Sequence, residues 1–237
     1  MHTEEYRVDW VNRHDWPRSR AEAYAFQDQR REQVICAGNT REPSLIAAVE
    51  AAYGHGGETA YAAAVVFSFP ELEEVDRSLA YSPARFEYIP GLFYYREGPV
   101  LVKALEGLQA KPDLVIVSGH GIAHPRRCGI ASHLGLDFDT TTIGCARRLL
   151  CGTHRPLDES KGSLQSIRHR EAEVGVAYRS KDGVKPIFIS PGHRCDLSFA
   201  RDIVVRCLRG YRLPEPLRAA HLRANKHKRY IEGKQVS

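Results

Sequence analysis

The sequence lacks the features that would place it in a membrane, a disulfide scaffold or a repeat architecture. No apolar run approaches the ~18 residues that cross a membrane. The six cysteines include no Cys-x-x-Cys pair and no closely spaced framework, so we expect reduced thiols. Repeats and low-complexity tracts are absent. The first residues, MHTEEYRVDWVNRHDW, are too charged for a secretory signal, and we expect a soluble, cytoplasmic protein that does not bind membranes.

The chain also lacks a strong charge of either sign. It has 34 Lys and Arg residues against 29 Asp and Glu residues, a formal net charge of +5. So small an excess is compatible with a nucleic-acid partner without demonstrating one. Hydrophobic residues make up 43% of the 237 residues, which excludes general disorder and favours one large domain. We expect residues 1–237 to form this domain, with a helical extension over 1–33 and a basic, flexible tail over 223–237.

Early hairpin patterns followed by alternating strands and helices predict an α/β domain with a mixed sheet. We expect Asp15 to cap a first helix over 15–33 and Asp196 to cap a late helix that ends at Gly210. A helix over 99–110 and a short final helix from Pro216 are also expected. Segment 44–53 is ambiguous: its place before the loop GHGGET favours a hairpin strand over 46–53, whereas its alanines favour a helix. Further strands are expected over 62–69, 114–117, 140–144, 174–178 and 186–190.

Residues 114–135, LVIVSGHGIAHPRRCGIASHLG, run from a buried strand into a glycine-rich loop. Ligand sites in open α/β sheets collect beyond the carboxyl ends of strands. Gly119 and Gly121 allow a ligand to approach the backbone, and Arg126 and Arg127 suit phosphate groups. Turn geometry alone also explains such glycines. Ser118 stands where such a strand normally presents a strong catalytic group.

Three further residues have both a structural and a chemical interpretation. Glu97 suits the first turn of a helix, Glu50 an exposed helical surface, and His193 a loop or a cap. Together, however, they are the carboxylates and imidazole that a hard-cation site requires. The tip Tyr88-Ile89-Pro90-Gly91 is likewise ambiguous, because its rings and apolar atoms suit either a wedge in a base stack or the core.

These motifs resemble the endonuclease V family, the inosine-directed nucleases with an RNase H-like fold. The resemblance extends from about residue 46 to about residue 224 and is dense in YIPGLFYYREGP, KPDLVIVSGHGIAHPRRCGIASHLG, TTIGCARRLLCG, SPGHRCDLSFA and YRLPEPLRAAH. It implies an RNase H-like mixed central β-sheet flanked by helices. It also implies a DNA-repair or RNA-processing enzyme, an endodeoxyribonuclease of the deoxyribonuclease V type. Such an enzyme recognises hypoxanthine in DNA or RNA and uses Mg²⁺ or Mn²⁺ to cut 3′ of the lesion.

The resemblance also implies a role for each matching residue. Glu97 matches an acid of the family's metal site, and His193 matches a histidine near it. Arg147 stands where the family usually has lysine. The strand-separating wedge corresponds to Tyr88, Ile89 and Pro90, and the pocket for the flipped base corresponds to Gly119, Gly121, Ile122 and His124. We expect the protein to act as a monomer on DNA, with RNA as an alternative substrate.

Two of the family's acidic positions are altered in this chain. IAAVEAAY stands where the family resembles VAGVDVAY, so Glu50 takes an aspartate position and the segment is expected to be a strand. VSGHG stands where the family resembles VDGQG, so Ser118 replaces an aspartate and His120 a glutamine. The extra methylene of Glu50 displaces its carboxylate by roughly 1 Å, and Mg²⁺ tolerates poor geometry badly. Mutation of a residue that only supports a metal ligand lowers metal affinity or activity by roughly 10–100-fold. The loss of the carboxylate at Ser118 should lower them by at least as much.

The sequence therefore supports several hypotheses. The first is a metal-assisted nuclease of weakened activity, in which Glu50 and Glu97 hold Mg²⁺, Ser118 occupies a ligand position without a carboxylate, His193 assists near the attacking water and Arg147 stabilises the phosphate. The second is a degenerate homologue that binds inosine-containing nucleic acid without efficient cleavage. The third is an unrelated α/β enzyme that binds a small phosphorylated ligand at GHGIAHP.

Overall fold

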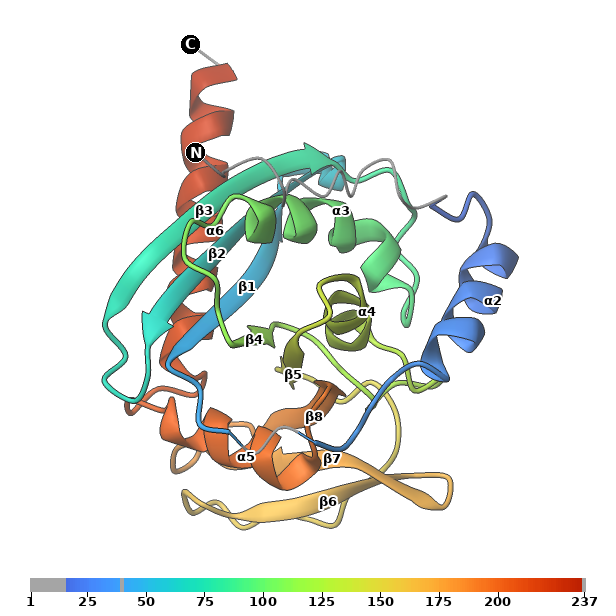
Figure 1. The fold of residues 1–237 in the computed structure, drawn as a ribbon, viewed down its shortest axis with the longest axis vertical. Coiled ribbons are helices and arrows are strands. Elements are labelled where there is room, and N and C mark those ends of the chain that lie inside the picture. The colour runs from blue at the N-terminus through green and yellow to red at the C-terminus, as the bar shows by residue number, and fades with distance from the viewer. Residues whose placement is uncertain (1–15, 39–40, 236–237) are drawn as a thin grey trace.

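A computed structural model describes residues 16–38 and 41–235, and its centre is one eight-stranded sheet (Figure 1). The strand order is β3-β2-β1-β4-β5-β8-β7-β6. The strands are β1 (Leu45–Tyr53), β2 (Thr59–Ser68), β3 (Glu74–Pro83), β4 (Leu114–Val117), β5 (Thr141–Ala146), β6 (Leu164–His169), β7 (Ala172–Tyr178) and β8 (Ile187–His193). The helices are α2 (Arg20–Arg31), α3 (Phe93–Glu106), α4 (Ile130–Asp137), α5 (Leu197–Arg206) and α6 (Glu215–Gln235), and a short 3₁₀ turn, η1, spans His55–Gly57.

The sheet is mixed, as the sequence predicts. Strand β1 pairs antiparallel with β2 and parallel with β4, and β4 pairs parallel with β5. The early hairpin is confirmed, since β1 and β2 are antiparallel neighbours, and β7 and β8 form a second antiparallel pair. The alanine-rich β1 is a strand because Ile46 through Glu50 are buried in the centre of the sheet, where packing outweighs the helical preference of alanine.

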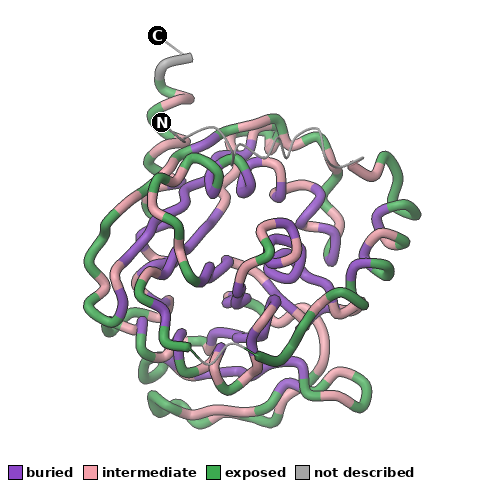
Figure 2. Tube along the Cα trace, viewed as in Figure 1, coloured by how far each residue is buried: buried purple, intermediate pink, exposed green. Residues whose placement is uncertain are grey.

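Helices cover both faces of the sheet. On one face, α3 and α4 pack over a cluster that includes Val49, Leu101 and Leu134, with α2 at its side. On the other face, α5 and α6 pack over a cluster that includes Ile116 and Leu217. Figure 2 shows buried residues gathered on the central strands and exposed residues along β6 and the outer end of α6. Among the described residues no helix is both long and apolar enough to cross a membrane.

Several predicted boundaries are wrong. Helix α2 is capped by Ser19, whose hydroxyl accepts from the Glu22 N–H at 3.2 Å, and Asp15 lies outside the described residues. Helix α3 begins at Phe93 and contains Pro99, because its buried face compensates for the lost backbone hydrogen bond. The expected flexible tail over 223–237 is helical through Gln235, as α6 packs across β1 and β2. The edge strands β3 and β6 were not predicted, because each has a single buried residue and therefore no apolar pattern in its sequence.

Candidate functional site

A cavity of about 420 Å³ opens at the carboxyl ends of β1 and β4, where the sequence places its candidate site. Glu50 belongs to β1, Ser118 directly follows β4, and Arg147 directly follows β5. Because β1, β4 and β5 are parallel, these residues emerge at the same edge of the sheet. Helix α3 adds Glu97 from the layer above. The structure thus brings together Glu50, Glu97, Ser118 and Arg147, which are distant in the sequence.

Glu50 is held by two side chains from other elements. Arg147 donates from Nη1 to Oε1 at 2.8 Å and from Nη2 to Oε2 at 3.2 Å, and His221 Nδ1 lies 3.2 Å from Oε1. The Glu50 residue is only 5% exposed. Burial by itself raises the pKa of the Glu50 carboxyl, but the hydrogen bonds from His221 and Arg147 and their charges more than offset it, so the pKa is lowered. Glu50 is therefore an ionised carboxylate already paired with a cation.

The pKa of the Glu97 carboxyl is raised, whereas that of Glu50 is lowered. The Tyr53 hydroxyl donates to Glu97 Oε1 at 3.2 Å. Burial and the neighbouring charge of Glu50 raise the pKa of Glu97 to about 7, against the lowering effects of the Tyr53 hydrogen bond and the Arg96 charge. The two carboxyls thus differ in protonation near neutral pH, and such a pair is typical of acid–base sites.

Ser118 lies where the parallel pairing of β4 with β1 ends. Its backbone N–H donates to the Val49 carbonyl at 3.1 Å, which places Ser118 next to Glu50 in the sheet. Its side chain lines the cavity. The hydroxyl of Ser118 therefore stands beside Glu50, where the resemblance implies an aspartate.

The structure corrects the expected place of His193. This residue pairs with Thr142 at the first end of β5, whereas Ala146 and Arg147 at the site lie at the other end. Its Nδ1 accepts a hydrogen bond from the Ile35 N–H at 3.2 Å. Strand β8 runs antiparallel to β5, so His193, the last residue of β8, lies beside the first residues of β5, at the end of the strands that faces away from the cavity.

The histidine that reaches Glu50 is His221, which the sequence interpretation missed. It ends the motif YRLPEPLRAAH, which the resemblance already included. The available signal was therefore this motif, but only the packing of α6 across β1 shows that the imidazole lies against Glu50.

The expected wedge is divided between the cavity and the core. Tyr88 is 65% exposed and rests against the Phe93 ring, with ring centroids 5.1 Å apart. Tyr88 and Pro90 line the cavity mouth. Ile89 instead packs against the hydrophobic cluster under α3. The exposed tip of this segment is therefore Tyr88 and Pro90.

Only part of the expected base pocket lines this cavity. Gly119 does so, whereas the N–H of Gly121 donates to Ser190 Oγ at 2.9 Å and that of Ile122 donates to the Pro191 carbonyl at 2.8 Å. A Cβ on Gly121 would lie 1.8 Å from the Pro191 carbonyl oxygen, so this glycine permits close backbone packing against β8. Gly121 and Ile122 thus serve the fold in this structure.

His124 lines a separate cavity of only about 10 Å³, which has room for at most one water. Its Nε2 donates to the Gly91 carbonyl at 2.8 Å, and its Nδ1 accepts from the Arg126 N–H at 3.2 Å. Gln27 of α2 closes the same cavity and also donates to the Gly91 carbonyl, at 2.8 Å. A purine therefore requires this cavity to open.

The residues present do not form a site for Mg²⁺ or Mn²⁺. Such hard cations take oxygen ligands, chiefly carboxylates. Within 16–38 and 41–235, no three His, Cys, Asp or Glu side chains are grouped so that they would hold a metal ion. Glu50 and Glu97 supply two carboxylates, of which the first has both oxygens bound to a guanidinium, and Ser118 supplies no charge.

Comparison with known proteins identifies the family. The sequence model of endonuclease V matches residues 28–222. The chain belongs to the endonuclease V family. It is 45% identical to endonuclease V of Trichormus variabilis over 208 residues, which cover 87% of this chain and 94% of that protein. It is 43% identical to endonuclease V of Roseiflexus castenholzii over 207 residues, covering 87% and 92% of the two chains.

Solved structures of endonuclease V share the fold. That of Streptomyces avermitilis is similar with a TM-score of 0.84 at 35% identity, covering 94% of this chain and 97% of the other. A single-residue variant of endonuclease V of Ciona intestinalis, bound to a 23mer DNA containing an inosine followed by a ribo-adenosine, has a TM-score of 0.79 at 28% identity, covering 89% and 97%. These similarities confirm the RNase H-like class of the mixed sheet and place the chain in a family of nucleases.

Proposed function

We propose that this chain binds nucleic acid that contains a deaminated purine, with hypoxanthine as the preferred base, and cleaves the strand 3′ of the lesion only weakly. The single observation that carries the proposal is the state of Glu50, whose two oxygens are both bound to Arg147 while Ser118 stands beside it. The family and the inosine-containing DNA bound to the Ciona intestinalis protein support the ligand. DNA is the expected partner, and RNA is the alternative.

Two features of the Glu50 cavity support binding of a nucleic-acid strand. Tyr88 and Pro90 present an exposed aromatic and rigid tip at the cavity mouth, which is suited to hold a base stack open. Arg147 and Arg148 line the cavity and suit phosphate oxygens. Because hypoxanthine cannot be read fully inside a duplex, the base must leave the stack and open the small cavity beside His124.

The chemical features are incomplete. A divalent cation would activate water and neutralise charge on the phosphate. The donor set here does not fit that group, so we assign no catalytic step to it. What remains is Glu97, whose pKa of about 7 suits the transfer of a proton at neutral pH. The placement of Glu97 in the cavity, where the Tyr53 hydroxyl holds its carboxyl, favours a second candidate, a nuclease of ordinary rate.

Restoring the acids separates the two candidates. Binding and nicking of inosine-containing and matched adenosine-containing DNA are measured with Mg²⁺ and with Mn²⁺, for the wild type and for Glu50→Asp/Ser118→Asp. We expect preferential binding of inosine by both proteins and at least about tenfold faster nicking by the double variant. Ser160→Asp, at an exposed serine outside the cavity, is the control.

Wild-type nicking as fast as that of the double variant would favour the second candidate. Equal affinity for inosine and adenosine would contradict the proposed function altogether. The same measurements on an inosine-containing RNA strand compare the two nucleic acids directly.

A further inference from the structure

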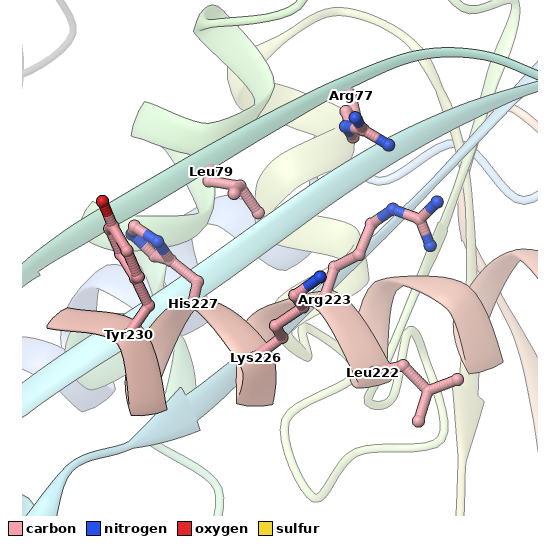
Figure 3. Close-up of a pocket in the computed structure, with 7 residues that line it drawn as sticks. All are labelled: Arg77, Leu79, Leu222, Arg223, Lys226, His227 and Tyr230. Carbon is pink, nitrogen blue, oxygen red and sulfur yellow. The ribbon is translucent and has the colours of Figure 1, made fainter. Parts of the chain in front are cut away.

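A second cavity, of about 430 Å³, lies between α6 and the edge strand β3 (Figure 3). We call it the β3–α6 groove. Its lining is both cationic and apolar, from two residues of β3 and five of α6: Arg77, Leu79, Leu222, Arg223, Lys226, His227 and Tyr230. None of these residues lines the cavity that holds Glu50.

Strand register fixes the relation between the groove and Glu50. Glu50 is opposite Ala63 in the β1–β2 pair, and Ala63 is opposite Leu79 in the β2–β3 pair. Residues directly opposite in antiparallel strands project from the same face. Glu50 and Leu79 therefore share a face, two strands or roughly 10 Å apart. Helix α6 lies on that face and connects the two places, because His221 contacts Glu50 and Lys226 lines the groove.

The groove carries an excess of positive charge. Glu74 pairs with both Arg77 and Arg223, so one carboxylate links β3 to α6 and holds two guanidiniums in place. The side chain of Lys226 makes no hydrogen bond or ion pair with any residue that the structure describes. Between positions 222 and 233 the chain has four Lys or Arg residues and a single Glu. The remaining charge is free to attract an anion.

Exposed apolar side chains lie between these cations. Leu79 is 45% exposed, Leu222 50% and Tyr230 57%. The His227 ring packs edge-on against Tyr61, with ring centroids 5.9 Å apart, and its Nε2 is buried without a hydrogen-bond partner among the described residues. A surface of cations with interspersed aromatic rings suits a nucleic-acid strand, because phosphates pair with the cations and bases stack on the rings.

We propose that the β3–α6 groove is a second nucleic-acid contact, which binds the part of the strand that flanks the lesion. The proposal rests on the proposed function, since it needs a strand held at the Glu50 cavity. Charge complementarity favours this occupant over a second copy of the chain. The exposed Tyr230 ring, on which a base can stack, and the sheet face shared with Glu50 favour it over an acidic protein.

The test compares two lengths of one inosine-containing DNA: a short oligonucleotide confined to the Glu50 cavity and the same sequence extended on both sides. We expect Lys226→Ala/Tyr230→Ala to weaken binding of the extended DNA about tenfold. Its affinity for the short DNA should equal that of the wild type. In a plot of the logarithm of the binding constant for the extended DNA against the logarithm of the salt concentration, the slope should become less steep by about one unit, because one phosphate contact is lost.

Lys181→Ala, at an exposed lysine in the turn between β7 and β8, is the matched control and should leave every measurement unchanged. Thermal unfolding of each variant verifies that the exposed substitutions preserve the fold. If the double variant binds the extended DNA as tightly as the wild type, with the same salt slope, the proposal is wrong.

The same experiment with adenosine in place of inosine separates this proposal from the proposed function. The wild type could bind both DNAs equally while Lys226→Ala/Tyr230→Ala still weakens binding of the extended DNA. That result would overturn the proposed function and support the groove as a nucleic-acid contact. Sedimentation tests the rival occupants. A wild-type dimer that the double variant dissociates, with unchanged DNA binding, would assign the groove to a second copy and overturn the proposal. Unchanged DNA binding together with variant-sensitive binding of an acidic peptide would overturn it in favour of a protein partner.

Discussion

The guanidinium of Arg147 binds both carboxylate oxygens of Glu50, at 2.8 and 3.2 Å. This two-point contact places a fixed positive charge against the carboxylate of a residue that is only 5% exposed. The backbone of Arg147 is itself held, because Arg212 Nη2 donates to its carbonyl at 2.7 Å. The pair therefore neutralises Glu50 from within the chain, and the neighbouring Ser118 adds no charge to the cavity.

The first prediction concerns the energy of this pair. Arg147→Met should lower the free energy of unfolding by about 2 kcal/mol, because it leaves a buried carboxylate without its charged donor. Glu50→Gln/Arg147→Met should cost clearly less than the sum of the two single changes, since the two residues contact each other. Urea denaturation of the wild type, both single variants and the double variant measures the cycle. Additive effects would show that the contact contributes nothing to stability.

The second prediction is a pH dependence that arises at Glu97. Its pKa is raised to about 7 in the folded chain against 4.5 for the unperturbed group, so between these values the folded state binds more protons than the unfolded state. Stability should therefore fall as pH rises through that window. The difference in urea midpoint between about pH 5 and about pH 8 should be larger for the wild type than for Glu97→Gln.

Glu159→Gln, at an exposed glutamate, is the control for this measurement and should keep the wild-type difference. Glu50 does not interfere in this window. Its lowered pKa gives a stabilisation that is complete above the ordinary carboxyl range and is lost only as pH falls through the depressed value. Equal pH dependence in the wild type and Glu97→Gln would show that Glu97 titrates as an ordinary carboxyl.

The third prediction tests whether Gly121 serves the fold or the ligand. Gly121→Ala would place a methyl 1.8 Å from the Pro191 carbonyl oxygen, so we expect a loss of about 4 kcal/mol or more, or failure to fold. Gly233→Ala in α6 meets nothing within 4 Å and should change stability by less than about 1 kcal/mol. Thermal unfolding compares the two. A stable Gly121→Ala variant that has lost only inosine binding would return Gly121 to the base pocket.

The fourth prediction concerns the exposed tip. Tyr88→Ala should alter the free energy of unfolding by less than about 0.5 kcal/mol, because the residue is 65% exposed. It should weaken binding of inosine in duplex DNA more than in a single strand, since only the duplex must be unstacked. Dissociation constants for both DNAs measure the effect, and Tyr211→Ala, at another exposed tyrosine, is the control. Equal losses for duplex and single strand would assign Tyr88 to simple contact.

Much of the fold was predictable because its signals are local. The hairpin of β1 and β2, the apolar strand β4 and the Asp196 cap of α5 each follow from residues that are adjacent in the chain. The start of α3 and the full length of α6 were not predictable. Both depend on burial against the sheet, which sequence propensity does not record.

The candidate site likewise has residues that the sequence predicted and residues that only the structure located. Glu50, Glu97, Ser118 and Arg147 were all named from motifs, and their convergence follows from strands and a helix that meet at one edge of the sheet. His193 was misplaced because the motif does not reveal that β8 runs antiparallel to β5. His221 was missed because its partner lies 171 positions away in the chain.

The sequence by itself determined the family and the mixed sheet, because motif identity and hydrophobic pattern depend only on the order of residues along the chain. Only the tertiary structure decided which charges meet. It places Arg147 and His221 in contact with Glu50 and His193 at the other end of the strands. It also forms a basic groove between α6 and β3. Electrostatic energies depend on separation in space and on burial, and neither is set by distance along the chain.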